Sequence, residues 1–149
     1  RGPGVVITSD GTGDDSIDIT ALGATVKYCG TYSAQSGGTS INGFNITSGG
    51  DEYRLMFNIV LSSDNHGIKS DANRGYIFGN TVIDADDRGI SIESGGGETR
   101  ILGNLGISND VGFVLLNTTA ENNVVTNNMH EGSIEDNSGT STVSNNETY

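Results

Sequence analysis

The chain contains almost none of the residues that crosslink or stiffen small domains. Its 149 residues include one cysteine, one proline and no tryptophan. A single cysteine excludes a disulfide framework and a cysteine-based metal site, so Cys29 is expected to be a small buried apolar side chain. No apolar run approaches the roughly 18 residues of a membrane-spanning helix, and we therefore expect no insertion into a membrane.

Positive charge is also scarce. The chain has 7 Lys and Arg residues against 19 Asp and Glu residues, which gives a formal net charge of −12. Such a charge disfavours nucleic acid as a partner, because the phosphate backbone repels it. An acidic surface of this kind suits a salt-rich or calcium-containing environment, or simply keeps the protein in solution.

Apolar residues make up only 33% of the chain, whereas glycine occurs 23 times. This composition fits a disordered chain or an elongated repeat fold with a thin apolar core, and a recurring pattern favours the second. Asparagines recur in apolar segments at steps of about 22, 24 and 23 residues, the range of solenoid repeats. The segments are Leu55–Leu61, Ile77–Ile83, Ile101–Ile107 and the looser Val124–Met129, with Asn58, Asn80, Asn104 and Asn127 as their asparagines.

A glycine followed by an apolar residue comes after each of the first three segments, and the fourth keeps only a degraded version. These are Gly67-Ile68, Gly89-Ile90, Gly112-Phe113 and Gly132-Ser133-Ile134. Glycine permits a backbone bend that a side chain would obstruct, and stacked asparagines can hydrogen-bond to one another. About 22 residues hold two or three short strands with their turns. The sequence therefore predicts an all-β fold, a right-handed parallel β-helix of five or six rungs.

We expect this β-helix to be a single domain over residues 1–149. Residues 1–4 are predicted to be a tail, 5–54 less regular rungs, 55–134 regular rungs, and 135–149 a decaying last rung. No amphipathic helix covers the ends, although an open rung exposes unpaired strand edges. The chain is therefore expected to be a fragment or module of a longer or assembled protein.

The repeated motif, apolar-x-Gly-Asn-x-x-apolar followed by Gly-Ile, resembles the β-helix repeats of the pectate-lyase-like superfamily over about two thirds of the chain. That superfamily includes polysaccharide lyases and hydrolases, epimerases and phage tailspikes, so the resemblance implies a fold and carbohydrate as the substrate class. Gly13-Asp14-Asp15, His66-Gly67 and Ile68-Lys69 each look similar to polygalacturonase motifs, but their spacing departs from that pattern. The lyase and epimerase motifs need prolines, and Pro3 is the only one.

Alignment of the glycines stacks charged turn residues on neighbouring rungs. Asp64 and Asp86 then share a column with Asn109, and Asp87 shares one with Asp110. One interpretation is a catalytic patch in which a carboxylic acid and a carboxylate cleave a glycosidic bond, formed by Asp86, Asp87, His66, Lys69 and Arg88. A second is a Ca²⁺ site of stacked oxygens formed by Asp64, Asp86, Asp87 and Asp110. A third is that these are solvated turn residues.

Another column lies four residues before each repeated asparagine and contains Arg54, Tyr76, Arg100 and Asn123. A tyrosine between two arginines suits an acidic sugar, because the ring stacks on the sugar and the guanidinium groups bind its carboxylates. An exposed strand edge with ordinary long side chains is the alternative.

These observations favour an extracellular, cell-surface or virion β-helix module of the tailspike or surface-fibre type, which presents a lateral face to a polysaccharide. A polysaccharide lyase or glycoside hydrolase is the alternative, and a self-associating structural solenoid is a third; whether the protein is an enzyme stays open. No cofactor is required, and Ca²⁺ is the candidate ion. The pattern is compatible with a homotrimer or with end-to-end self-association.

Overall fold

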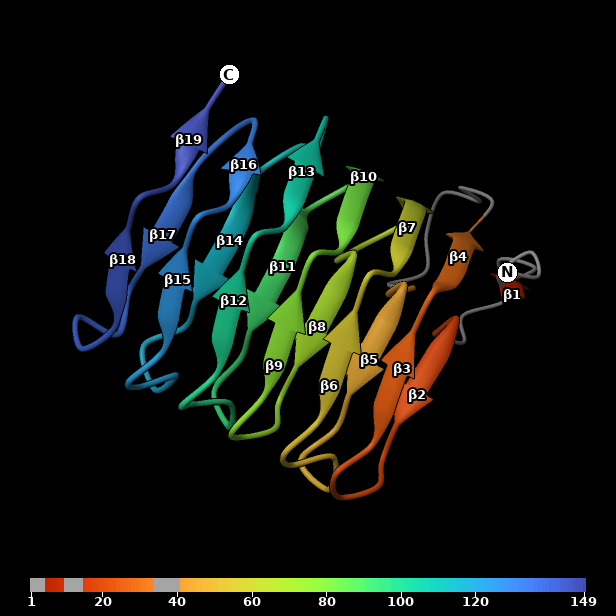
Figure 1. Ribbon diagram of the computed structural model, residues 1–149, viewed down its shortest axis with the longest axis horizontal. Helices are drawn as coiled ribbons and strands as arrows, with labels where there is room; N and C mark the ends of the chain where they lie inside the picture. The colour runs from red at the N-terminus through yellow and green to blue at the C-terminus, as the bar shows by residue number, and fades with distance from the viewer. Residues whose placement is uncertain (1–4, 10–14, 34–40) are drawn as a thin grey trace.

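The computed structural model describes residues 5–9, 15–33 and 41–149, and these residues form strands and turns without any helix. The strands belong to three parallel sheets that coil for about five turns, which confirms the predicted right-handed parallel β-helix. Figure 1 shows the strands of successive turns side by side along the axis of the coil. The predicted tail at residues 1–4 and the Gly13-Asp14 pair lie outside the described residues.

Each turn of the coil contributes one strand to each sheet in a fixed order. Sheet A contains β1 (Val5–Ser9), β4 (Cys29–Ser33), β7 (Ile59–Ser63), β10 (Thr81–Ala85), β13 (Leu105–Ile107), β16 (Met129–His130) and β19 (Glu147–Thr148). Sheet B contains β2 (Ile17–Ile19), β5 (Phe44–Ile46), β8 (Ile68–Ser70), β11 (Arg88–Ile92), β14 (Gly112–Leu116) and β17 (Ile134–Asp136). Sheet C contains β3 (Thr25–Lys27), β6 (Arg54–Met56), β9 (Tyr76–Phe78), β12 (Arg100–Leu102), β15 (Val124–Thr126) and β18 (Thr142–Ser144).

The core is a stack of inward columns, because alternate residues of each short strand face the axis. In sheet C, Leu55 pairs with Ile77 and Ile77 with Ile101, and all three are fully buried. Cys29 is half-buried against this core and is a free thiol. Within residues 5–9, 15–33 and 41–149 there is no helix with the length and apolar character needed to cross a membrane.

The predicted asparagine ladder is present, with one correction. The backbone N and Nδ2 of Asn58 both donate to Oδ1 of Asn80, at 2.9 and 3.0 Å, and Asn80 donates in the same way to Asn104. The next member is Asn128 rather than the predicted Asn127, and Asn146 extends the ladder by one more rung.

The reason for the correction lies in the turn before each ladder residue. That turn residue has a left-handed backbone conformation, with φ of 64° at Gly79, 61° at Gly103 and 55° at Asn127. Glycine and asparagine adopt this conformation most readily. Asn127 therefore occupies the turn position, and the ladder position falls to Asn128.

The predicted role of the glycines holds at Gly67, whose added Cβ would lie 2.7 Å from the Gly89 carbonyl oxygen one rung away. The third glycine-apolar pair, Gly112-Phe113, departs from the predicted alignment, because Gly112 pairs with Arg88 rather than with Gly89. Phe113 takes the glycine position instead, and its ring fills the space that Gly106 leaves in sheet A. Sheet A has Val60 and Val82 at the two preceding positions of that column.

Candidate functional site

The outer face of sheet C carries the predicted arginine and tyrosine column. Arg54 pairs with Tyr76, and Tyr76 pairs with Arg100, so the three side chains lie on adjacent strands. Val124 follows Arg100 in this column, where the sequence predicted Asn123, because the ladder residue is Asn128. The column lies in a groove of about 680 Å³, which we call the sheet C groove.

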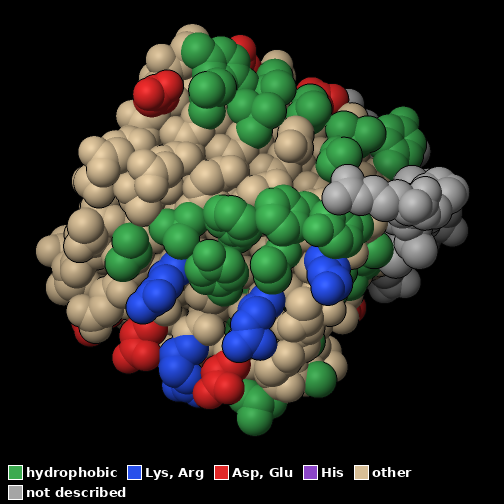
Figure 2. Space-filling model, in the orientation of Figure 1, with side chains coloured by type: hydrophobic (Ala, Val, Ile, Leu, Met, Phe, Trp, Pro, Cys, Tyr) green, Lys and Arg blue, Asp and Glu red, His purple; other side chains and the backbone are tan. Residues whose placement is uncertain are grey.

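Positive charge is concentrated in this groove. Of the 7 Lys and Arg residues in the chain, three line it, namely Arg54, Arg74 and Arg100. Arg74 is paired with Asp51 and Glu52 at 3.1 and 3.4 Å. Arg54 and Arg100 are exposed and form no ion pair within the described part of the chain. Figure 2 shows Lys and Arg side chains gathered along one border of an apolar band on this side.

Aromatic side chains lie beside the two free arginines. Tyr76 stacks on Phe78 with ring centroids 5.7 Å apart, and Phe78 contacts Phe57 edge to face at 5.2 Å. Flat apolar rings next to guanidinium groups can bind a sugar through its apolar face and its carboxylate at once. Glu52 and Glu98 also line the groove, where their carboxylates can accept hydrogen bonds from hydroxyl groups of a ligand.

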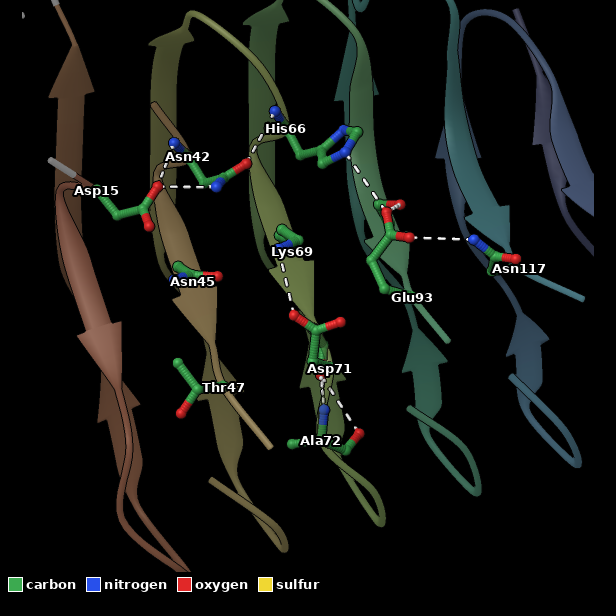
Figure 3. Close-up of polar contacts among 12 residues, drawn as sticks. Asp15, Asn42, Asn45, Thr47, His66, Lys69, Asp71, Ala72, Glu93 and Asn117 are labelled. Atoms are coloured by element: carbon green, nitrogen blue, oxygen red, sulfur yellow. Dashed lines mark hydrogen bonds and ion pairs between the residues drawn. The ribbon is translucent and has the colours of Figure 1, made fainter. Parts of the chain in front are cut away.

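The outer face of sheet B is polar and joined by hydrogen bonds between rungs (Figure 3). Asn42 donates to Asp15 at 2.8 Å, and Asn117 donates to Glu93 at 3.1 Å. Lys69 lies in the middle row, with Nζ 3.2 Å from Asp71. This predicted catalytic lysine is therefore paired with a carboxylate that the sequence did not single out.

His66 lies in the turn before β8, at the amino edge of this face, and is 7% exposed. Its Nδ1 is 3.7 Å from Asp87 and its Nε2 is 3.6 Å from Glu93, which is too long for hydrogen bonds. Burial lowers the pKa of His66 below its usual value, and this outweighs the opposing effect of the two carboxylates. The ring is therefore neutral at pH 7 and has the form that can accept a proton.

Hydrogen bonds help to lower the pKa of two carboxylates, Glu93 beside His66 and Glu135 beside Arg88. Burial alone would raise the pKa of Glu93, but hydrogen bonds from Ser91 and Asn117 outweigh it and hold that pKa below its usual value. The hydrogen bond and charge of Arg88 likewise hold the pKa of Glu135 below its usual value. Both groups are ionised at neutral pH.

Arg88 is buried and reaches across a neighbouring strand. Its Nε is 3.6 Å from Asp87, and its Nη2 is 3.1 Å from Glu135 in β17, two strands away. Gly112 lies between them, and a Cβ there would be 2.8 Å from Nη1 of Arg88. The absence of a side chain at Gly112 therefore leaves room for this ion pair.

Asp86 does not join His66 and Asp87. It lies in the turn after sheet A, where its backbone N donates to the Ser63 carbonyl, and Asp110 makes the equivalent bond to Ala85. Asp64, Asp86 and Asp110 therefore form one column, and this corrects the predicted alignment with Asn109. Asp87, the fourth predicted metal ligand, belongs to the next column, which continues with Val111 instead of Asp110.

No three His, Cys, Asp or Glu side chains of the described ranges converge in an arrangement that could hold a metal ion. The acidic column instead has an electrostatic cost. Partial burial and the neighbouring Asp110, Asp64 and Asp84 raise the pKa of Asp86. The folded state therefore binds a proton at Asp86 more tightly than the unfolded state does, and ionisation of Asp86 destabilises the fold as the pH rises through this pKa.

Replacing Asp86 with asparagine should stabilise the protein at pH 7 by about 0.5 kcal/mol, after solvent screening of this exposed group, or about 1–2 °C in Tm. The gain should disappear below the ordinary pKa of 3.8, where the carboxyl group is protonated in both states. It should also shrink at high salt. Thermal unfolding at pH 7 and near pH 3 checks this, with Glu121→Gln as an exposed control; an equal gain at both pH values would contradict it.

No family model, curated protein or solved structure matches this chain.

Sequence reasoning aligned Arg54, Tyr76 and Arg100 in one column and grouped His66 with Asp87 in one patch, but it missed Glu93, Glu135 and Arg74. Glu93 and Arg74 follow strands of sheet B in the loops toward sheet C, and Glu135 lies 47 residues from Arg88. The loops between sheets B and C differ in length from coil to coil, so no fixed spacing marks Glu93 and Arg74 in the sequence.

Proposed function

We propose that this chain is a β-helix module of an extracellular, cell-surface or virion structure, and that it binds an acidic polysaccharide in the sheet C groove. The observation that carries the proposal is the pair of exposed, ion-pair-free arginines, Arg54 and Arg100, on either side of Tyr76. The suggested membership of the pectate-lyase-like superfamily, of the tailspike or surface-fibre type, belongs to this proposal.

The charge distribution supports an anionic ligand in spite of the net charge of −12. Exposed charges more than about 8 Å apart are largely screened at physiological salt, so a ligand in the groove responds mainly to the charges that line it, which are three arginines against Glu52 and Glu98. Residues on alternate strands have their backbones about 9–10 Å apart across the sheet, and Arg54 and Arg100 are such a pair. That spacing allows them to contact carboxylates on different residues of one extended chain.

The test is binding of a polyuronate, such as polygalacturonate, compared with a neutral dextran of similar length. Wild type should bind the polyuronate, and Arg54→Ala or Arg100→Ala should each weaken binding about 10-fold, because each loses a charge-assisted hydrogen bond. Lys69→Ala is the matched control, since it removes the same charge from sheet B. Isothermal titration calorimetry measures all four proteins.

Two results would overturn this proposal. One is equal binding of polyuronate and dextran, since the arginines would then have no role. The other is equal loss of affinity in Lys69→Ala and Arg54→Ala, which would indicate general charge attraction rather than a groove.

A second candidate function, polysaccharide cleavage, is favoured by the neutral buried His66 between Asp87 and Glu93. In that alternative His66 acts as a general base, and Asp87 orients its ring. The test is depolymerisation of polygalacturonate and alginate with and without Ca²⁺, by wild type, His66→Ala and Asp87→Ala. Cleavage that both variants abolish would establish an enzyme; the binding proposal expects no cleavage by any of the three proteins.

A further inference from the structure

The two sides of the sheet C groove carry opposite charge. The side formed by the strands presents Arg54, Tyr76 and Arg100, which we call the strand column and which contains no acidic residue. The side formed by the preceding loops presents Glu52, Arg74 and Glu98, each two residues earlier, which we call the turn column. Figure 2 shows acidic side chains beside the Lys and Arg side chains along this border.

Glu98 is the carboxylate of the turn column that stays unpaired. Arg74 binds Asp51 and Glu52, with distances between nitrogen and oxygen of 3.1 and 3.4 Å. Glu98 is exposed and forms no ion pair with any residue that the structure describes. A carboxylate without a counter-charge therefore lies opposite Arg100, whose guanidinium group also has no ion-pair partner among these residues.

The backbone of the turn column is an independent sign that its charged side chains have a use. Glu52, Arg74 and Glu98 all have left-handed backbones, with φ of 62°, 57° and 53°. Glycine and asparagine adopt this conformation most readily, and Gly23 and Asn122 occupy the same position in the coils on either side. Strain of this kind is retained where the side chain contributes to function.

We infer that the sheet C groove selects a polysaccharide whose carboxylates lie along one edge, namely a polymer in which acidic and neutral sugars alternate. This inference rests on the proposed function and names the class of ligand. The groove is lined by residues of four successive turns of the coil, within 52–56, 74–76, 98–100 and 122–124. An extended ligand in it therefore lies along the coil axis.

The geometry of an extended sugar chain explains this selection. Successive strands are about 4.8 Å apart, and one sugar advances a flat β-linked chain by a similar distance and is turned over relative to the sugar before it. An alternating polymer therefore directs its carboxylates to Arg54 and Arg100 and places a neutral sugar on the Tyr76 ring. The opposite edge then offers only uncharged groups, such as hydroxyl groups that donate to Glu98.

A polymer made only of uronic acids fits the two sides of the groove less well. Because its sugars also alternate in direction, every second carboxylate points toward the turn column. There it approaches Glu98, which repels it, and Arg74, which is already paired with two carboxylates. Such a polymer still binds through Arg54 and Arg100, but more weakly than the alternating polymer.

The test compares hyaluronan, which has one carboxylate on every second sugar, with polymannuronate, which has one on every sugar, as chains of equal length. Wild type should bind hyaluronan at least about 5-fold more tightly in isothermal titration calorimetry. Glu98→Gln should reduce this ratio of affinities at least about 2-fold, because it removes an exposed charge that repels polymannuronate. Glu147→Gln is the matched control, since Glu147 is an exposed glutamate of β19 in sheet A, and its ratio should equal that of wild type.

The outcomes separate this inference from the proposed function. Binding that Arg54→Ala weakens, but that is as tight for polymannuronate as for hyaluronan, would overturn the inference and leave the proposed function standing. A ratio that Glu98→Gln leaves unchanged, or that Glu147→Gln changes equally, would do the same. If hyaluronan, polymannuronate and polygalacturonate all fail to bind, both the inference and the proposed function are overturned.

Discussion

Replacing Asn80 with alanine should lower the free energy of unfolding by about 3–5 kcal/mol, because several buried polar groups lose their partners at once. Oδ1 of Asn80 accepts from the backbone N and Nδ2 of Asn58. Its Nδ2 donates to the Leu55 carbonyl and to Oδ1 of Asn104, both at 3.0 Å. Asn80 is fully buried, so water cannot replace these bonds.

Urea denaturation followed by far-ultraviolet circular dichroism measures this loss. The matched control is Asn137→Ala, since the Asn137 side chain is exposed and makes no hydrogen bond within the part of the chain that the structure describes. Its free energy of unfolding should change by less than about 0.5 kcal/mol. If both variants unfold at the same urea concentration, the ladder contributes nothing to stability.

The fold could be predicted from the sequence because the nearest neighbour of a core residue in this architecture is its own counterpart one repeat away. Leu55, Ile77 and Ile101 illustrate this, since each pairs with the next and all are fully buried. A period in the sequence therefore reports contacts in space. In an ordinary globular core, such contacts would have no common sequence separation.

The register was harder to predict, because the coils differ in length. Successive ladder asparagines are separated by 22, 24, 24 and 18 residues. With two adjacent candidates, Asn127 and Asn128, the apolar pattern alone does not choose between them. The turn position was the missing signal: Gly79 and Gly103 immediately precede ladder residues, and Asn127 is the residue that can adopt the same left-handed backbone.

Errors in the predicted register affected the candidate sites unequally. Arg54, Tyr76 and Arg100 lie in one column, as predicted, because they keep a constant distance from ladder residues that were assigned correctly. The turn columns were aligned on Gly112, which is not equivalent to Gly67 and Gly89. The Asp64 column was therefore given Asn109 in place of Asp110, and the acidic repulsion at Asp86 was missed.

The Phe113 ring fills the space that a side chain at position 106 would occupy. Substitutions at these two positions should therefore have large effects on stability. A Cβ at Gly106 would overlap the Phe113 ring, so Gly106→Val should cost about 3–5 kcal/mol, at or above the usual range for overpacking. Phe113→Gly should cost a similar amount, about 4–5 kcal/mol, because it empties a fully buried site.

The double variant Gly106→Val/Phe113→Gly restores the arrangement of the preceding rungs, where Val82 faces Gly67. It should therefore be more stable than the sum of the two single losses by at least about 2 kcal/mol. Urea denaturation of the four proteins of this double-mutant cycle measures the coupling. Where a single variant is too unstable to measure, Gly106→Ala and Phe113→Leu form a milder cycle. Additive losses in both cycles would show that the ring and the glycine do not compensate each other, and that Phe113 is held by its 5.4 Å stack on His130 instead.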